Sequence, residues 1–319
     1  MTRTTGIGLL VACSNLKAYP PPDHLKVSSL PAGDPGTRLQ EWVDRLSGAE
    51  PQTPAIGLYS GVYWSEVKRV WARLKEVDNQ APLWIVSAGY GLLSERAGVS
   101  PYAATFTPGQ ADSIGDPLLS PRDASERWWK GLSGWEGPCP GHPRTIPQLL
   151  DASHPRLWVL VAGPHYVRAL TAQLEEIVHH GLQERLLIIS VGLKQEAHVS
   201  RLHSLVVPSD ARWEHVLGKG RGSLSIRLAG RLLSLADCRP ERMVEARDAL
   251  AKEGRALPPL SLPRRKLASD NDVLAFIEQR RVLEPTISFT RLLRAFRDSQ
   301  HACEYKRFRS LVNSLNAKD

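Results

Sequence analysis

Short apolar runs alternate with longer amphipathic segments over the first two thirds of the chain. The first run, GIGLLVAC at 6–13, is apolar throughout and ends in turn-forming residues. Similar runs lie at 83–88, 156–163 and 185–191, and a weaker one lies at 204–209. Continuous apolar runs of about four to eight residues, bounded by turn signals, are typical of buried strands. The pattern therefore predicts a set of buried strands along this part of the chain.

Segments with helical spacing separate these runs. Residues 62–78 carry apolar side chains on one helical face, and Pro164 begins a second helix that extends to about His179. Residues 95–150 have little periodicity and many Pro and Gly, which is typical of a functional or irregular loop. Strands that alternate with helices predict an α/β fold, with a mostly parallel central sheet and helices on both faces.

The chain turns helical after the last predicted strand and ends in a separate module. The stretch PPLSLPRRK precedes Ser269 and Asp270, and either residue is suited to cap the helix that follows. Two further amphipathic helices complete the chain. We expect an α/β domain over 1–236, a helical connection and basic linker over 237–268, and a small all-helical module over 269–319.

The charge of the chain favours a polyanionic partner. The formal net charge is +8 and the pI is about 9.5. Residues 264–319 hold 12 Lys and Arg against 7 Asp and Glu, which is five of the eight net positive charges. Because the charges of this tail coincide with apolar helical periodicity, we expect the tail to bind nucleic acid.

Other sequence features bear on membrane insertion, secretion, disulfide bonds and metal binding. No apolar stretch approaches the roughly 20 residues of a membrane span, and the first residues lack the layout of a secretion signal. The four cysteines are scattered, which favours a reducing, cytoplasmic environment over a disulfide framework. Cys139 and His142, with His154 further on, are too few for structural zinc, which normally has four ligands. We expect neither a metal nor a cofactor.

The residues that follow the predicted strands have a similar amino-acid composition. They read CSNLKAY, SAGYGLLS, AGPHY, VGLK and PSD, and are rich in Gly, small hydroxyls, Asn, His and Tyr. In open parallel sheets, ligands bind at the carboxyl ends of the strands. These segments are therefore expected to form the floor of one pocket, although Gly and Ser also serve simply to turn the chain.

Four of these motifs carry a family resemblance. ACSNLK, LYSGVYW, IVSAGYGLLS and SPYAATF resemble a bacterial family patterned Cys-Ser-x-x-Lys, Leu-Tyr-x-Gly, Leu-Ser-Ala-x-Tyr-Gly-Leu and Pro-Tyr, which is related to peroxide-stress DNA-binding proteins. Over roughly residues 6–236 the chain is similar to phage-defence DNA glycosylases. The resemblance implies a uracil-DNA-glycosylase-like fold and excision of a modified base from phage DNA, glucosylated hydroxymethylcytosine being the first guess. Asn15 departs from the basic or other polar residue of many members.

The chemistry of a glycosylase determines which groups its active site needs. Cleavage of an N-glycosidic bond passes through a sugar with oxocarbenium character, so the enzyme orients a water and stabilises the departing base. The resemblance implies that Asn15, after the first strand, orients this water; capping of the next turn is the alternative use of Asn. Asp112 and Asp116 are alternative catalytic carboxylates if the long loop folds over the site.

Aromatic and small polar side chains near the strand ends are expected to bind the extruded base. Stacking on Tyr90 and Tyr102 would contribute about 1–3 kcal/mol per base, and Tyr19 and Tyr63 are weaker candidates. His165 is expected to donate to the leaving base or to a phosphate. The predicted base-binding residues are Ser14, Tyr59, Ser87, Gly89, Tyr90, Tyr102 and His165.

A glycine-rich stretch, GKGRGSLS at 218–225, predicts a phosphate contact. Exposed amides at the start of a helix bind anions. The stretch lacks the spacing of a nucleoside-triphosphate loop and does not follow a strand as a dinucleotide fingerprint does. We therefore expect it to hold a phosphate of double-stranded DNA. The predicted phosphate-binding residues are Lys17, Lys219, Arg221, Arg294, Lys306 and Arg307.

Two other functions stay open at this point. A sensor would bind DNA or a nucleotide in the same pocket without turnover. A base-exchange transglycosylase would need a carboxylate nucleophile and a free incoming base. Substitution of Asn15 distinguishes a DNA glycosylase from a sensor, because only an enzyme has turnover to lose.

Overall fold

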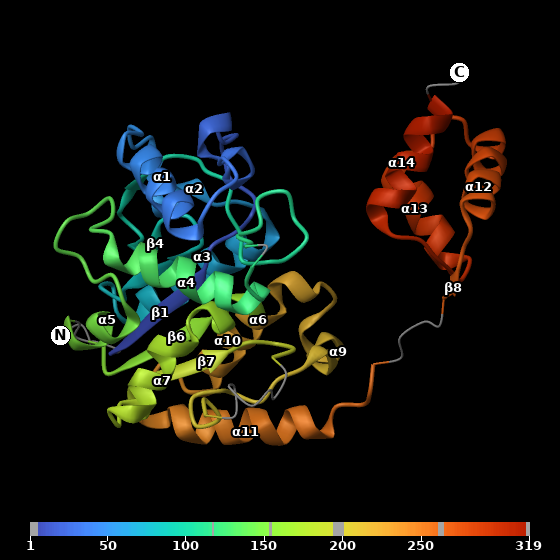
Figure 1. Cartoon of the computed structure of the whole chain (residues 1–319). Coiled ribbons are helices and arrows are strands. Elements are labelled where there is room, and N and C mark those ends of the chain that lie inside the picture. The colour runs from blue at the N-terminus through green and yellow to red at the C-terminus, as the bar shows by residue number, and fades with distance from the viewer. Residues whose placement is uncertain (1–5, 117, 153–154, 194–200, 261–264, 317–319) are drawn as a thin grey trace. The chain divides into compact units, whose positions relative to one another are not determined.

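The chain forms two compact units (Figure 1). The first spans Met1–Pro258 and the second Pro259–Asp319. The helical segment expected in the connection after residue 236 therefore belongs to the first unit. None of the helices in the described ranges has the length and apolar character needed to cross a bilayer. The computed structural model describes residues 6–116, 118–152, 155–193, 201–260 and 265–316.

A five-stranded sheet forms the centre of the first unit. Its strand order is β4-β3-β1-β6-β7. Parallel pairing joins β3 to β1, β1 to β6 and β6 to β7, and only β4 is antiparallel to its neighbour. The strands are β1 (Ile7–Ala12), β3 (Leu83–Ser87), β4 (Gly91–Ser94), β6 (Leu157–Val161) and β7 (Leu186–Ile189), and a separate antiparallel pair joins β2 (Thr53–Pro54) to β5 (Gly98–Val99).

The central strand β1 is buried at all of its positions. Side chains alternate between the two faces of a strand, so both faces of the sheet are covered at β1. Gly8 is required there, because a Cβ at this position would lie 2.5 Å from the Trp158 ring on β6. The predicted α/β class with a mostly parallel sheet is confirmed.

Helices surround the sheet (Figure 1). On one side α3 and α10 pack against each other and against β1, β6 and β7, and α11 packs on α10. A second group joins α1, α4 and α6. The helices of this unit are α1 (Pro35–Ser47), α2 (Ala55–Leu58), α3 (Gly61–Val77), α4 (Pro121–Gly134), α5 (Ile146–Ala152), α6 (Pro164–Ala169), α7 (Thr171–His179), α9 (Glu214–Leu217), α10 (Leu224–Leu235) and α11 (Met243–Ala256).

Three sequence predictions need correction. The prediction of a fifth strand at 204–209 is wrong, because only an isolated bridge joins Val206 to Ile188 of β7. The stretch 95–150, read as a loop, contains α4 and most of α5, whose tryptophans and prolines hid the helical period. The helix after Pro164 ends at Ala169, and α7 restarts two residues later.

The second unit is a small helical module with its own core. It contains β8 (Lys266–Leu267), α12 (Asp270–Leu283), α13 (Phe289–Asp298), β9 (His301–Ala302) and α14 (Tyr305–Asn316). Ser269 and Asp272 form a capping box at the start of α12, so Ser269 is the cap. The apolar faces of the three helices meet in a cluster that includes Ile277, Phe296 and Phe308. The predicted helical C-terminal module is confirmed.

Candidate active site at the strand ends

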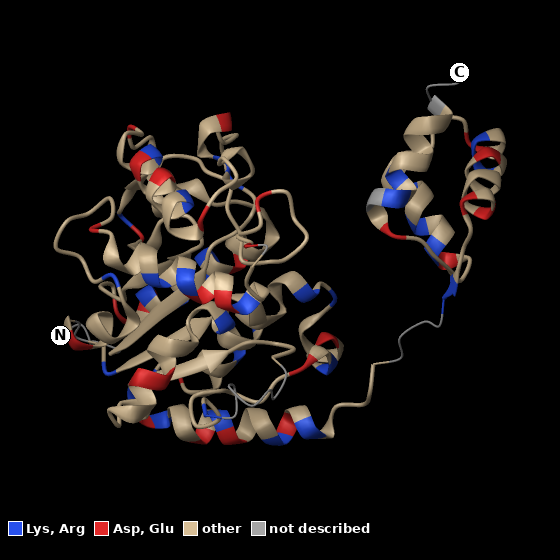
Figure 2. Ribbon diagram, in the orientation of Figure 1, with Lys and Arg blue, Asp and Glu red and all other residues tan. Residues whose placement is uncertain are grey.

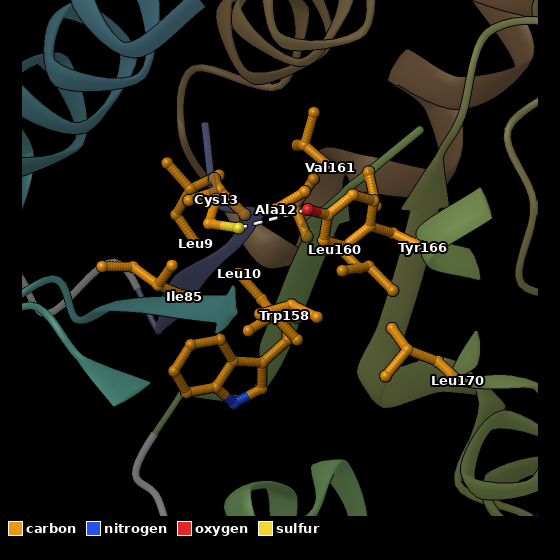
Figure 3. Packing of buried hydrophobic residues seen from close by; sticks show 14 of the residues in the cluster. Leu9, Leu10, Ala12, Cys13, Ile85, Trp158, Leu160, Val161, Tyr166 and Leu170 are labelled. Atoms are coloured by element: carbon orange, nitrogen blue, oxygen red, sulfur yellow. Dashed lines mark hydrogen bonds between the residues drawn. The ribbon is translucent and has the colours of Figure 1, made fainter. Parts of the chain in front are cut away.

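The sheet has a topological switch point between β1 and β6. From β1 the chain continues to β3 on one side, and β6 is added later on the other side. In open sheets of this kind the crevice outside the two carboxyl ends is the usual place for a ligand. Here the Cys13 thiol lies 3.2 Å from the Tyr166 hydroxyl and joins the two strand ends (Figure 3). The residues that follow β1 and β6 are therefore neighbours.

Ser14 holds the turn that follows β1. Its hydroxyl accepts a hydrogen bond from the Leu16 amide at 3.1 Å and donates one to the Ser60 carbonyl at 3.1 Å. Because this hydroxyl is engaged, Ser14 acts here as a structural residue of the turn. The Asn15 side chain is exposed, and Ser14 performs the capping that was the alternative use of Asn15.

Lys17 lies over a group of tyrosine rings. It is half-buried and pairs with Tyr59 through an isolated antiparallel bridge. Its Nζ lies 4.5 Å from the centre of the Tyr102 ring and donates to the Asn15 carbonyl at 3.4 Å. Burial lowers the pKa of Lys17, while the nearby Cys13 and the carboxylate of Asp112 act in the opposite direction. The structure thus places this amine at the strand ends, against aromatic faces.

Three tyrosines that the sequence predicts to bind the base are buried. Tyr59, Tyr90 and Tyr102 are at most 2 % exposed, so in this structure they present no free face to a base. The Tyr102 hydroxyl lies 2.7 Å from Ser87 Oγ and 3.1 Å from the Tyr59 hydroxyl. The rings of Tyr59 and Tyr102 form the floor beneath Lys17.

Ser87 and Gly89 support this floor. Ser87 Oγ accepts hydrogen bonds from the amides of Gly89 and Tyr90 at 3.2 and 2.9 Å, and so holds the turn after β3. A Cβ on Gly89 would lie 2.4 Å from the Tyr102 ring, which explains the glycine by close packing. Both residues lie at the strand ends, as expected, but their contacts in this structure are with the protein itself.

Exposed apolar side chains border the same site. Leu16 is 62 % exposed and Tyr19 is 52 % exposed. Val62, at the start of α3, is 73 % exposed, and Leu16 packs over its neighbour Gly61. Sequence reasoning missed Leu16 and Val62 and ranked Tyr19 low. The available signal was the position of Leu16, an apolar residue inside a polar turn.

The long loop does return to the strand ends. Phe106 packs edge-on against Tyr166, with ring centres 5.1 Å apart. Thr105 donates its amide to the Asp112 carbonyl at 2.9 Å, and Asp112 Oδ1 accepts from the amide and hydroxyl of Ser28 at 3.1 and 2.6 Å. The charge of Asp112 also acts on Lys17, so this carboxylate lies near the amine. Asp116 instead accepts the Leu118 amide in a local turn.

His165 lies at the start of α6, directly after β6. It is half-buried, and its pKa is lowered first by desolvation and then by the charge of Arg168. A neutral imidazole can both donate and accept a hydrogen bond. The ring is thus suited to contact an uncharged or anionic group at the switch point.

One arginine, Arg227 on α10, binds the carbonyl groups of the glycine-rich loop. The Arg227 guanidinium donates to the carbonyls of Leu217, Gly218, Lys219 and Gly220. Because the C=O and N–H of a trans peptide unit point in opposite directions, the amides of these units face away from Arg227. Lys219 and Arg221 are exposed beside these amides.

This loop lies at the same edge of the sheet as the switch point. The amide of Val191, which follows β7, donates to Ser225 Oγ on α10 at 3.1 Å. The start of α10 and the preceding loop are therefore at the carboxyl end of β7. Arg221 also forms an ion pair of 3.5 Å with Glu214.

The basic residues predicted in the C-terminal module have different surroundings. Arg294 on α13 is exposed and lines a hollow of about 620 Å³ with Arg280 and Arg291. Figure 2 shows Lys and Arg positions along the helices of this module. Arg307 is paired with Asp270 at 2.7 Å and ties α14 to α12. The side chain of Lys306 lies outside the described part of the structure.

No cluster of three or more metal-ligating side chains occurs among the described residues. The His142 amide donates to the Cys139 carbonyl in a local turn, and His154 lies outside the described residues.

Comparison of the chain with models of protein families, with curated proteins and with solved structures finds no match in any of the three. The resemblance to phage-defence DNA glycosylases therefore stays a prediction from the sequence motifs.

Proposed function

We propose that this protein is a DNA glycosylase that excises a modified base from phage DNA by hydrolysis of the N-glycosidic bond. One observation carries the proposal. At the switch point of the sheet, the turn after β1 exposes Asn15, Leu16 and Tyr19 around the half-buried amine of Lys17. This turn combines an amide for orienting water with apolar groups for opening a base stack.

Extrusion of the base is assigned to the exposed apolar residues. Apolar wedges inserted between base steps unstack them at a cost of a few kcal/mol, which contacts to the opened DNA offset. Leu16 and Val62 are the wedge in this proposal, and Tyr19 stacks on the extruded base in place of the buried Tyr90 and Tyr102.

The bond cleavage is assigned to polar groups on both sides of the switch point. The Asn15 side-chain carbonyl accepts a hydrogen bond from the attacking water and aims it at C1′ of the sugar. The Asp112 carboxylate counters the positive charge that develops on the sugar, and His165 donates to the leaving base. No step needs a metal ligand set or a cofactor.

The DNA backbone is assigned to basic groups. The outward-facing amides of residues 219–221, with Lys219 and Arg221, bind a phosphate near the strand ends. The C-terminal module adds contacts that depend on charge rather than on sequence. We place this activity in the cytoplasm, in agreement with four cysteines that are all free.

Incubation of the full chain with three DNAs tests the proposal. They carry glucosylated hydroxymethylcytosine, hydroxymethylcytosine or plain cytosine, and released base is measured by mass spectrometry. Base released from only a modified DNA, with one abasic site or strand break for each base, is the expected result. Salt-dependent binding to every DNA without any released base would refute the glycosylase and favour the sensor. Release only when a free base is supplied would favour the transglycosylase.

The C-terminal module is expected to set part of the salt dependence of DNA binding. An Arg294→Ala variant of the full chain loses one phosphate contact, so the slope of log affinity against log salt becomes shallower by about 0.9. Gln279→Ala, in the same hollow, removes no charge and is the matched control. Fluorescence anisotropy at several salt concentrations measures both slopes. Equal slopes for the two variants would exclude a backbone contact at Arg294.

A further inference from the structure

The amine of Lys17 has surroundings that suit a nucleophile. It faces the Tyr102 ring at 4.5 Å and the Tyr59 ring at 5.8 Å, and among the described residues its one hydrogen bond is the 3.4 Å contact to the Asn15 carbonyl. Within the described residues, no carboxylate oxygen lies within ion-pair distance of it. The ring faces and the charge of Asp112 favour the ammonium form, but desolvation by burial is the larger effect and favours the neutral amine.

Its position coincides with that of the reacting sugar in the proposed function. Asn15, which is assigned to the attacking water, is two residues away, and its backbone carbonyl accepts from the Lys17 amine. A group that close to the water lies beside C1′, the atom the water attacks. After base release, C1′ becomes an aldehyde whenever the abasic sugar opens its ring.

We infer that Lys17 condenses with the aldehyde of an abasic deoxyribose, which gives the protein a strand-cleaving lyase activity. This inference rests on the proposed function for its natural substrate. Its ligand class is wider, since any abasic site in double-stranded DNA carries the same aldehyde. Lys17 is then a catalytic residue of a second step, rather than the phosphate contact that its sequence position suggested.

The strand-cleaving reaction at Lys17 needs no oxidant or reductant. The neutral amine adds to C1′, and uptake of one proton from solvent with loss of one water leaves a protonated imine. A water removes a proton from C2′, and the electron pair of that C–H bond forms a double bond to C3′. The C3′–O bond breaks, and the oxygen leaves as the 5′-phosphate of the downstream strand. Hydrolysis of the imine restores Lys17 and releases an unsaturated aldehyde on the upstream strand.

Three features of the site support this chemistry. Burial lowers the pKa of Lys17, so a larger fraction of the amine is neutral near pH 7 than for an exposed lysine. Asp112, the carboxylate that acts on Lys17, stabilises the positive charge of the protonated imine. The tyrosine floor keeps the amine in place, because the rings beneath it are buried and hydrogen-bonded to one another.

Borohydride trapping on preformed abasic DNA tests the inference. The full chain is mixed with duplex DNA whose single abasic site was made beforehand by another enzyme, and sodium borohydride reduces any imine to a stable amine. A covalent protein–DNA adduct is expected, and mass spectrometry of its peptides is expected to find the sugar remnant on Lys17. Because this readout uses the wild-type chain, it does not depend on the folding of a variant.

Two variants sharpen the result. Lys17→Arg is expected to lose the adduct, since a guanidinium does not form the imine. Lys26→Arg, at a neighbouring lysine that is paired with Asp23 at 2.6 Å, is expected to keep it. An adduct mapped to another amine, an adduct that persists in Lys17→Arg, or no adduct at all would overturn the inference.

The two proposals fail separately. Base release is measured on modified DNA that has no abasic site, and trapping is measured on abasic DNA that has no modified base. Release without trapping would leave a glycosylase that uses water alone. Trapping without release would leave an abasic-site lyase and refute the proposed base excision.

Discussion

An Asn15→Ala variant is expected to release base about 10²–10³-fold more slowly than the wild-type chain, since one oriented polar contact to the reacting group commonly has this effect. The side chain is exposed, and Ser14 rather than Asn15 holds the turn. Loss of the amide should therefore leave the fold and the affinity for DNA unchanged. Single-turnover release of base, measured beside anisotropy binding curves, separates the two effects.

The matched control is Asn79→Ala. Asn79 is also exposed, but it precedes β3 and so lies at the opposite edge of the sheet from the switch point. Its release rate should equal that of the wild-type chain. A rate for Asn15→Ala within about threefold of wild type would assign the water to another group, and Asp112→Asn would be the next variant to measure.

An Arg144→Met variant is expected to lower the free energy of unfolding of the first unit by about 3–5 kcal/mol. Arg144 is 8 % exposed, and its guanidinium donates to carbonyls of four residues at 2.5–3.1 Å. Burial lowers its pKa to about 10, so the group stays charged near pH 7. Methionine fills a similar volume but removes all of these hydrogen bonds to buried carbonyls. The four acceptors are the carbonyls of Tyr90, Leu92, Leu132 and Trp135.

Urea denaturation followed by tryptophan fluorescence measures this loss. Arg255→Met, at the exposed end of α11, is the control and should shift the midpoint little. Arg144→Lys should also destabilise, because one ammonium cannot reach the same carbonyls. Since two of these carbonyls, those of Tyr90 and Leu92, lie in and after the turn that follows β3, the Arg144 variants should also weaken the floor of the site. A change below about 1 kcal/mol would contradict the assigned role of Arg144.

Local pattern was enough to predict most elements of the fold. The strands at 6–13 and 83–88 and the helix at 62–78 are apolar or amphipathic over their whole length, and each lies within one or two residues of its prediction. Caps such as Ser269 act over three residues, so the sequence alone shows them. Parallel pairing also followed from the alternation of strands and helices.

The position of the candidate site was likewise open to sequence reasoning. The ends of parallel strands meet at one edge whatever their order, so Asn15, Lys17 and His165 were expected together. The structure places them at the switch point between β1 and β6. What these residues do there is a matter for the proposed experiments.

The exposure of each side chain was decided by tertiary structure alone. Tyr19 and Tyr102 are equivalent as residue types, yet Tyr19 is 52 % exposed and Tyr102 is fully buried. The difference arises because Tyr102 packs against Trp42, Tyr59 and Gly89, which lie far from it in sequence. Such packing depends on three-dimensional distance, which a one-dimensional pattern does not contain.

The environment of Lys17 has the same origin. Its spacing from β1 is fixed by sequence, but its contacts with Tyr102 and its interaction with Asp112 join segments about 85 and 95 residues away along the chain. Sequence by itself determined which strands, helices and caps form, because these depend on neighbouring residues. Only the tertiary structure decided which side chains are buried, paired or free to meet DNA, because burial and electrostatics depend on every segment that packs nearby.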